Sequence, residues 1–336
     1  DCAREHRMSP AGDVRIGTCT WNYDSWVGLV YSTPQQYAAA YLSEYAEHFD
    51  TAEIDSWFYR IPTPAEVRAY REAVPGTFRF SCKVPRMLTL THLRKGMQNS
   101  QTGSTAASPV SKDAVSGRPP NSDFLSLDLF RRFLDVIDPL LGMMDALIFE
   151  FEYLNKQKMT GLGRFLEEFD AFFSRLPAGL PVALEPRNGN YMKAQYFDFI
   201  RSKGLIHVFS EKQYMPHVYD LYKSFKNYFV KQPSASPGQA SGEKSAVSDT
   251  GAADNHQGSR SAVVRLLGGD RKKIEKETGG SWDKIVMPRQ DLSEVAGMLL
   301  DMEGFLDVTV NVNNHYEGSA PLTVDRLRRL LENKNV

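Results

Sequence analysis

The stretch that decides the fold is ALIFEFEYLNKQKMTGLGRFLEEFDAFFSRLPAGLPVALE, residues Ala146–Glu185. It begins with the short apolar run Ala146–Phe151 and ends with a similar run, Pro181–Glu185, and both are typical of buried strands. Between them, apolar side chains recur every three or four residues from Leu162 to Leu176, which predicts a helix with one apolar face. A strand, a helix and a further strand in this order predict two parallel strands joined by a right-handed crossover.

The same alternation continues on both sides of this unit. Further strand-like segments are predicted at residues 14–18, 51–55, 78–83, 205–210, 262–267 and 306–312. Each predicted strand is followed by a helical segment, and Thr33 and Pro34 have the residue types of a helix start after the first strand. Eight such units close most naturally into a barrel, so we predict an α/β fold, a single (β/α)8 TIM-type barrel. The alternative is an open, doubly wound sheet, but no GxGxxG motif follows the first strand.

Two low-complexity segments, residues 99–122 and 232–262, interrupt the pattern. They contain almost no large apolar side chains, so they cannot bury enough surface to offset the entropy lost on ordering. We expect both to be disordered surface insertions in a barrel domain that spans residues 12–332. Without them, the chain has about the length of one compact barrel.

Composition excludes several classes of protein. The 336 residues carry a formal net charge of −1, so there is no global attraction to nucleic acid or to an anionic membrane. The 3 cysteines are far apart and form no CxxC motif, which argues against a disulfide scaffold or structural zinc. No apolar run approaches the roughly 18 residues of a membrane helix, and the opening DCAREHRMSP lacks a signal peptide's apolar stretch. We therefore expect a cytoplasmic protein with no membrane partner.

Polar residues gather where the predicted strands end, which is where barrels of this kind carry their functional sites. Side chains two apart on a strand share a face, so three pairs should each point inward together: Glu53 with Asp55, Glu185 with Arg187, and Asn311 with Asn313. The full set of candidates at strand ends and in the loops after them is Glu53, Asp55, Lys83, His92, Glu150, Glu185, Arg187, Arg265, Asn311, Asn313, Asn314 and His315.

The charged members of this set allow two interpretations. Buried charges are costly unless they are paired, so they could form a salt-bridge network that only holds the barrel mouth together. They could instead line a pocket in which Arg187, Arg265 and Lys83 clamp carboxylate or phosphate oxygens. Glu53, Asp55 or Glu185 would then act as an acid or a base.

Two more specific chemistries stay open at this point. Paired carboxylates suit glycoside hydrolysis, which depends on a separation that the sequence does not give. A metal site would need ligands such as Glu53, Glu150, Glu185 and His315, but no HxH or HExxH spacing supports it. We predict no metal, and no particular cofactor follows from the sequence.

Several blocks of sequence together resemble the YecE-like family, domain of unknown function 72. They keep the family's order and cover most of the chain outside the two insertions, and they are specific only in combination. The blocks are IGTCTW (Ile16–Trp21), FDTAEIDSWFYRIP (Phe49–Pro62), FRFSCKV (Phe78–Val84), LEPR (Leu184–Arg187), VVRLLG (Val263–Gly268) and NNHYEGSAP (Asn313–Pro321). The resemblance implies a TIM-type barrel and no specific activity.

Carried over by motif, the family's polar set falls on Glu53, Tyr59, Arg60, Lys83, His92, Glu185, Arg187, Arg265, Asn313 and Asn314. The chain also departs from the family pattern. Asp55 replaces a usual asparagine, Glu150 lies where a glutamine is usual nearby, and Asn188 stands in place of a histidine. These changes imply divergence in substrate or activity.

We therefore expect an enzyme that acts on a polar, phosphorylated or sugar-like molecule by carboxylate acid/base chemistry. The expected catalytic residues are Glu53, Glu185, Lys83 and His92, and the expected substrate-binding residues are Tyr59, Arg60, Arg187, Arg265, Asn313 and Asn314. The expected partner is thus a small polar or anionic ligand. One alternative is a nucleic-acid-binding or nuclease-like barrel that uses its mouth and the basic run 271–273, which the neutral net charge disfavours. Another is a non-catalytic scaffold whose insertions bind partners.

Overall fold

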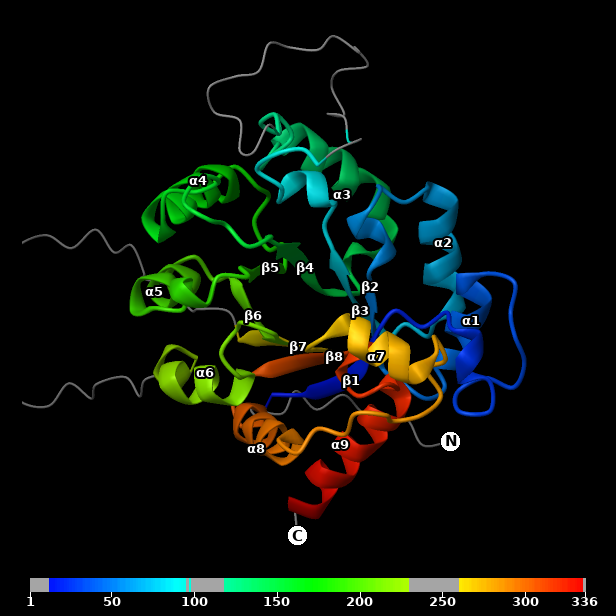
Figure 1. Cartoon of the computed structure of the whole chain (residues 1–336). Helices are drawn as coiled ribbons and strands as arrows, with labels where there is room; N and C mark the ends of the chain where they lie inside the picture. The colour runs from blue at the N-terminus through cyan, green and yellow to red at the C-terminus, as the bar shows by residue number, and fades with distance from the viewer. Residues whose placement is uncertain (1–11, 95–96, 98–117, 230–259, 335–336) are drawn as a thin grey trace, which may run out of the picture.

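A closed barrel of eight parallel strands forms the centre of the protein (Figure 1). The computed structural model describes residues 12–94, 97, 118–229 and 260–334. Each strand pairs with the next, and the last pairs with the first. The strands are β1 (Val14–Cys19), β2 (Thr51–Ile54), β3 (Arg79–Lys83), β4 (Met144–Glu150), β5 (Val182–Glu185), β6 (Ile206–Lys212), β7 (Ser261–Gly268) and β8 (Asp307–Val312). This confirms the predicted (β/α)8 fold.

Helices surround the barrel, and all but α7 (Arg271–Thr278) cover the outer side of its strands (Figure 1). They are α1 (Ala38–Tyr45), α2 (Pro64–Ala73), α3 (Leu127–Leu141), α4 (Leu162–Phe173), α5 (Ala194–Ser202), α6 (Val218–Phe225), α7 (Arg271–Thr278), α8 (Leu292–Glu303) and α9 (Ala320–Lys334). Short 3-10 helices follow several strands, including η2 (Ser56–Phe58), η3 (Arg86–Leu88) and η6 (Asn314–Tyr316), and η5 (Lys226–Tyr228) follows α6.

The apolar stripe predicted in the deciding stretch packs α4 against the barrel. Phe165, Phe169 and Phe172 of α4 are buried, and the rings of Phe169 and Phe172 each lie 5.6 Å from that of Phe149 on β4. Edge-to-face aromatic pairs of this kind add to the free energy gained by burying their area. The stripe therefore fixes the helix over β4 and leaves the inward face of the strand for the barrel interior.

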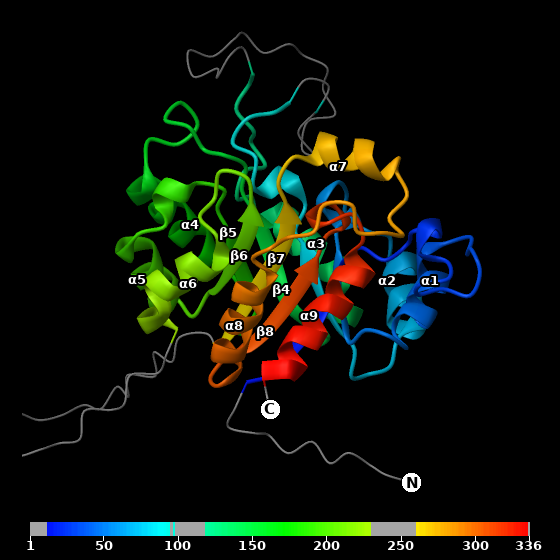
Figure 2. The same ribbon diagram turned by 60° about the horizontal axis from the view of Figure 1, so that its bottom comes forward.

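The interior of the barrel changes from apolar to charged along the strands. Its middle is an apolar cluster made of Ala146, Ile148, Ala183, Ile206, Val208 and Val263. Residues two positions further along the same strands are Glu150, Glu185, Ser210 and Arg265. Since alternate residues of a strand share a face, these polar side chains form the next layer, at the carboxyl ends of the strands. Figure 2 shows β6, β7 and β8 pointing toward this end, where α7 also lies.

Three details of the sequence-based prediction were wrong. The first helix begins at Ala38 rather than at Thr33, since the preceding loop is extended and its Ser32 amide donates to the Glu44 carboxylate of α1. β6 runs two residues past Ser210, because its last two residues still pair with β7. Most of the insertions 99–122 and 232–262 lies outside the described residues, but their last few residues belong to the barrel structure.

Asn121, at the end of the first insertion, shows why these last residues belong to the barrel structure. Asn121 is buried, and its side-chain amide donates to the carbonyls of Met87 and Leu90 at 2.8 and 2.6 Å. Ser261, near the end of the second insertion, begins β7. Within the described ranges, no helix is both long and apolar enough to cross a membrane.

Candidate functional site

Arg265 on β7 lies at the centre of the charged layer. Its side chain is 1% exposed. Its Nε and Nη2 donate to the two carboxylate oxygens of Glu53 at 2.8 and 2.6 Å. Its Nη1 donates to Glu185 at 2.5 Å and to Glu150 at 3.0 Å. Carboxylates from three strands thus enclose the guanidinium, so the Arg265 side chain that we expected to clamp a substrate is occupied by these partners.

Two more cations complete the network. Lys83 Nζ lies 2.8 Å from Asp55 and 3.4 Å from Glu150, and 4.5 Å above the Phe58 ring. Arg187 Nη2 lies 2.8 Å from Glu150 and 3.2 Å from Glu185. The network brings together charged residues from β2, β3, β4, β5 and β7, so the inward orientation predicted from their spacing is correct.

Four carboxylates share three cations in this network, so one carboxylate lacks a full compensating charge. Burial, reinforced by Asp55, raises the pKa of Glu53 to about 7 against the opposing attraction of Arg265. Burial also disfavours the charged form of Glu150, but Arg187, Lys83 and Arg265 outweigh it and hold the pKa of that carboxyl well below its usual range. Glu53 is more deeply buried than Glu150, and it is therefore the carboxylate that lacks a full compensating positive charge.

A cavity of about 690 Å³ opens directly above the network, at the carboxyl ends of β4, β5 and β6. Four cations and two carboxylates contribute to its wall, together with aromatic and apolar side chains. The lining residues are Phe58, Tyr59, Arg86, Leu90, Arg94, Glu150, Glu152, Tyr153, Arg187, Lys212, Gln213, Tyr214 and Met215. Glu150 and Arg187 belong both to the network and to the cavity wall, so they connect the two.

Arg187 keeps hydrogen-bonding capacity toward this cavity. Its side chain is 21% exposed, and both of its ion pairs use Nη2. Its Nε is buried and has no hydrogen-bond partner among the described residues, so the donors left for the cavity are those of Nη1, which neither ion pair uses. A guanidinium has five N–H donors in a fixed plane, so Arg187 can bind an anion while it remains held by Glu150 and Glu185.

The other expected site residues occupy varied positions. Tyr59 is 64% exposed in the cavity wall, with the Arg86 guanidinium 5.1 Å above its ring. Arg60 instead pairs with Glu66 of α2 at 2.7 Å. His92 is buried, with its Nδ1 3.0 Å from the Thr91 hydroxyl oxygen, and its backbone bridges to Pro120.

Asn313 and Asn314 shape the turn after β8. The Asn313 side-chain oxygen accepts from the backbone N–H of His315 at 2.9 Å. The Asn314 side-chain oxygen accepts from the Ala320 N–H at 2.8 Å, at the start of α9. Asparagine commonly caps turns in this way, so the side-chain oxygens of both expected substrate-binding residues are engaged in local structure.

The metal site considered from the sequence does not assemble. Glu53, Glu150 and Glu185 converge, but on the guanidinium of Arg265. His315 instead contacts Asn313 and Glu275. Elsewhere, one ligand atom each from Glu211, His217 and Asp291 lie within 4.8 Å of one another. Arg289 donates to both carboxylates of that set at 2.9 Å and supplies its positive charge.

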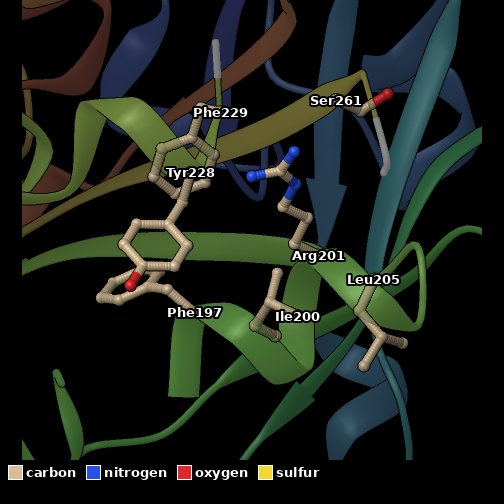
Figure 3. A pocket seen from close by; sticks show the side chains of 7 residues that line it. All are labelled: Phe197, Ile200, Arg201, Leu205, Tyr228, Phe229 and Ser261. Carbon is tan, nitrogen blue, oxygen red and sulfur yellow. The ribbon is translucent and has the colours of Figure 1, made fainter. Parts of the chain in front are cut away.

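A much smaller hollow, drawn in Figure 3, includes Leu205 and Ser261 in its wall, so it lies at the amino ends of β6 and β7. It has a volume of about 20 Å³, enough for about one water molecule. Its wall is largely apolar and consists of Phe197, Ile200, Arg201, Leu205, Tyr228, Phe229 and Ser261. This size rules out a substrate, so the mouth cavity is the better candidate site.

The family described as "Protein of unknown function DUF72" matches residues 15–336, nearly the whole barrel. The chain belongs to this family. It is 33% identical over 79 residues to UPF0759 protein YecE of Escherichia coli strain K12, a match that covers 24% of this chain and only 25% of YecE.

Solved structures of DUF72 proteins share the fold. One from Enterococcus faecalis has a TM-score of 0.58 at 17% identity, with 95% of each chain covered. One from Thermotoga maritima has a TM-score of 0.58 at 16% identity, with 95% of this chain and 99% of that chain covered. At such identities the likeness extends to the barrel and not to a shared substrate, so the function has to be argued from the site.

Sequence reasoning missed much of the cavity wall of this DUF72 protein. Arg86, Arg94, Tyr153 and Tyr214 lie in loops, where no periodicity indicates which way a side chain points. Lys212 had a usable signal, because it lies two residues after Ser210 on an inward-facing strand. It was missed because β6 was predicted to end too early.

Proposed function

We propose that the mouth cavity binds a small anionic molecule, such as a phosphorylated sugar, and that this DUF72 protein is an enzyme acting on it. The observation that carries the proposal is the charge of the wall, with four cations against two carboxylates. Glu152, one of those carboxylates, is also paired with Lys158 outside the wall at 2.8 Å. The wall therefore carries an excess of positive charge, which favours an anionic ligand.

The shape of the cavity supports the same class of ligand. Its volume of about 690 Å³ lies in the range of small-molecule sites. Phe58, Tyr59, Tyr153 and Tyr214 provide aromatic surface, on which the apolar face of a sugar ring can pack. Charged and aromatic side chains in one wall suit a molecule that has both an anionic and a less polar part.

The roles proposed for the charged residues follow from their exposure. Arg187 reaches the cavity and binds the anionic group, and Arg86 and Arg94 contribute charge from the η3 loop. Glu53 and Glu185 are 0% exposed, and their oxygens accept hydrogen bonds from Arg265. They therefore position Arg265 and, through it, the floor of the cavity, while the acid–base step belongs to groups that reach the cavity wall.

Binding of phosphorylated and plain sugars tests the proposal. We expect glucose 6-phosphate to raise the midpoint of thermal unfolding and glucose to leave it unchanged, with affinities measured by calorimetry. Arg187→Gln should weaken binding by roughly 10- to 100-fold, the cost of a charge-assisted hydrogen bond. Arg71→Gln on the exposed surface of α2 is the matched control and should bind as the wild type does. Equal responses to both sugars, or full binding by Arg187→Gln, would contradict the proposal.

A further inference from the structure

Lys212 is the last residue of β6 and the one lysine in the wall of the mouth cavity among the described residues. Ile206, Val208 and Ser210 precede it at every second position. The first two belong to the apolar interior, and the Ser210 hydroxyl donates to the Glu185 carboxylate at 2.8 Å. Lys212 therefore continues the inward-facing row of the strand and ends it at the cavity.

The pairing of β6 with β7 changes register beside Lys212. Glu211 pairs with Leu266 of β7, but Lys212 pairs with Gly268, so the pairing skips Leu267. Irregular pairing of this kind often redirects a side chain at the end of a strand, and it is frequent next to active sites. Gly268 has a φ of +80°, and a Cβ there would lie 2.1 Å from the His315 carbonyl oxygen, so glycine is required beside Lys212.

Among the residues that the structure describes, the Lys212 amine has no carboxylate partner of its own. Within the described part of the chain, no salt bridge or hydrogen bond joins its Nζ to another residue, whereas Lys83 nearby is paired with Asp55 and Glu150. Partial burial is the main cause that lowers the pKa of Lys212, and the positive charge of Arg187 lowers it further. Glu150, Glu185 and Arg265 are the other charges that act on it, and the two carboxylates only partly oppose the shift.

A lysine that is partly desolvated and placed next to another cation is a typical nucleophilic amine. We propose that Lys212 is a catalytic nucleophile, whose Nζ condenses with the carbonyl carbon of an aldehyde or ketone that also carries a phosphate or carboxylate group. The inference deepens the proposed function and rests on it, because the anionic group would be held by the cationic cavity wall.

The covalent step needs no oxidant, reductant or co-reactant. The lone pair of the uncharged amine forms the N–C bond, and the electrons of the carbonyl π bond move to oxygen. The two amine hydrogens leave with that oxygen as water, and the C=N bond closes. The imine nitrogen then takes one proton from solvent. Its positive charge would lie near Glu150, which the network keeps ionised, so the iminium is stabilised where it forms.

Pyridoxal 5′-phosphate is a suitable probe, because it is an aldehyde with a phosphate and its imine can be reduced irreversibly with borohydride. Full-length protein would be treated with the probe and borohydride, and the modified lysines identified by peptide mass spectrometry. We expect Lys212 to be labelled several-fold faster than Lys223, an exposed lysine on α6. Inorganic phosphate should slow labelling at Lys212 and not at Lys223, and Lys212→Arg should lose only the Lys212 adduct.

The outcomes separate this inference from the proposed function. Similar labelling of Lys212 and Lys223, or no adduct at Lys212, overturns the nucleophile. If glucose 6-phosphate still stabilises the wild type and not Arg187→Gln, the proposed anion site stands without the nucleophile. If the sugar phosphate has no effect either, both proposals fail. The wild-type labelling pattern decides the question even if a variant at position 212 does not fold.

Discussion

Glu150 on β4 and Glu185 on β5 lie directly opposite each other in the sheet, and two arginines bridge both carboxylates. Arg265 does so through Nη1 from inside the barrel, and Arg187 does so through Nη2 from the cavity side. Two neighbouring carboxylates would repel each other without these cations. The arrangement divides the mouth into a closed lower layer, centred on Arg265, and an open upper layer, where Arg187 can reach a ligand.

Arg265→Met tests the structural part of this division. The substitution keeps much of the length of the side chain but leaves the Glu53 and Glu185 carboxylates buried without their cation. Breaking a buried ion pair typically costs about 3–5 kcal/mol, and we expect the free energy of unfolding at pH 7 to fall by about that amount. Urea denaturation measures it, with Arg71→Met on the exposed side of α2 as the control. A loss below about 1 kcal/mol would mean that Arg265 is not needed to neutralise the layer.

The stability of the protein should depend on the ionisation of Glu53. Burial raises its pKa in the folded state from 4.5 to about 7, so folded protein binds the proton more tightly than unfolded protein does. The stability due to Glu53 is thus complete below about pH 4.5 and is lost as the pH rises through 7, by at most about 1.4 kcal/mol per pH unit. The glutamine of Glu53→Gln cannot ionise. The difference in the free energy of unfolding between the wild type and this variant should therefore shrink from pH 5 to pH 8. A constant deficit across this range would contradict the raised pKa.

Asn121 links the end of the first insertion to the cavity wall. Its side-chain amide donates to the carbonyls of Met87 and Leu90, and Arg86, Leu90 and Arg94 line the cavity from the same loop. Asn121→Ala leaves two carbonyls without this donor, and we expect a loss of about 1–3 kcal/mol in stability together with weaker binding of glucose 6-phosphate. Asn121→Asp keeps an acceptor for the Asp123 amide but loses the donor, so it should show both effects. Ser122 is exposed and next to Asn121, and Ser122→Ala should show neither effect.

The sequence was most informative where strand geometry determines side-chain direction. Glu53, Lys83, Glu185 and Arg265 meet at one end of the barrel because parallel strands place their carboxyl ends together and alternate residues face inward. Which of them could reach a substrate was not predictable, because that depends on how tightly Arg265 is enclosed by partners from distant strands.

Loops account for most of what the sequence left undetermined. Asn313 was expected to bind substrate, and its side-chain oxygen caps the turn after β8, since a short polar side chain can satisfy a nearby backbone N–H as readily as a ligand. Arg86 and Tyr214 form part of the cavity, but their positions depend on loop conformations that have no period. The fold could therefore be predicted from the sequence, whereas the residues that line the cavity could be identified only from the structure.

The nucleic-acid alternative makes a different prediction from the small-ligand proposal. It uses the basic run at the start of α7, where the Arg271 Nε already pairs with Glu275 at 2.7 Å. We expect the triple variant Arg271→Gln, Lys272→Gln and Lys273→Gln to bind glucose 6-phosphate within about twofold of the wild type, because exposed pairs contribute little. Fluorescence anisotropy with a labelled DNA duplex, at salt concentrations from about 50 to 200 mM, provides the contrast. Tight DNA binding that weakens steeply with salt and is lost in the triple variant would favour the alternative. The salt dependence would indicate contacts with DNA phosphates, because such contacts release counterions. The loss in the triple variant would separate the two proposals, because a sugar-phosphate pocket does not require this run.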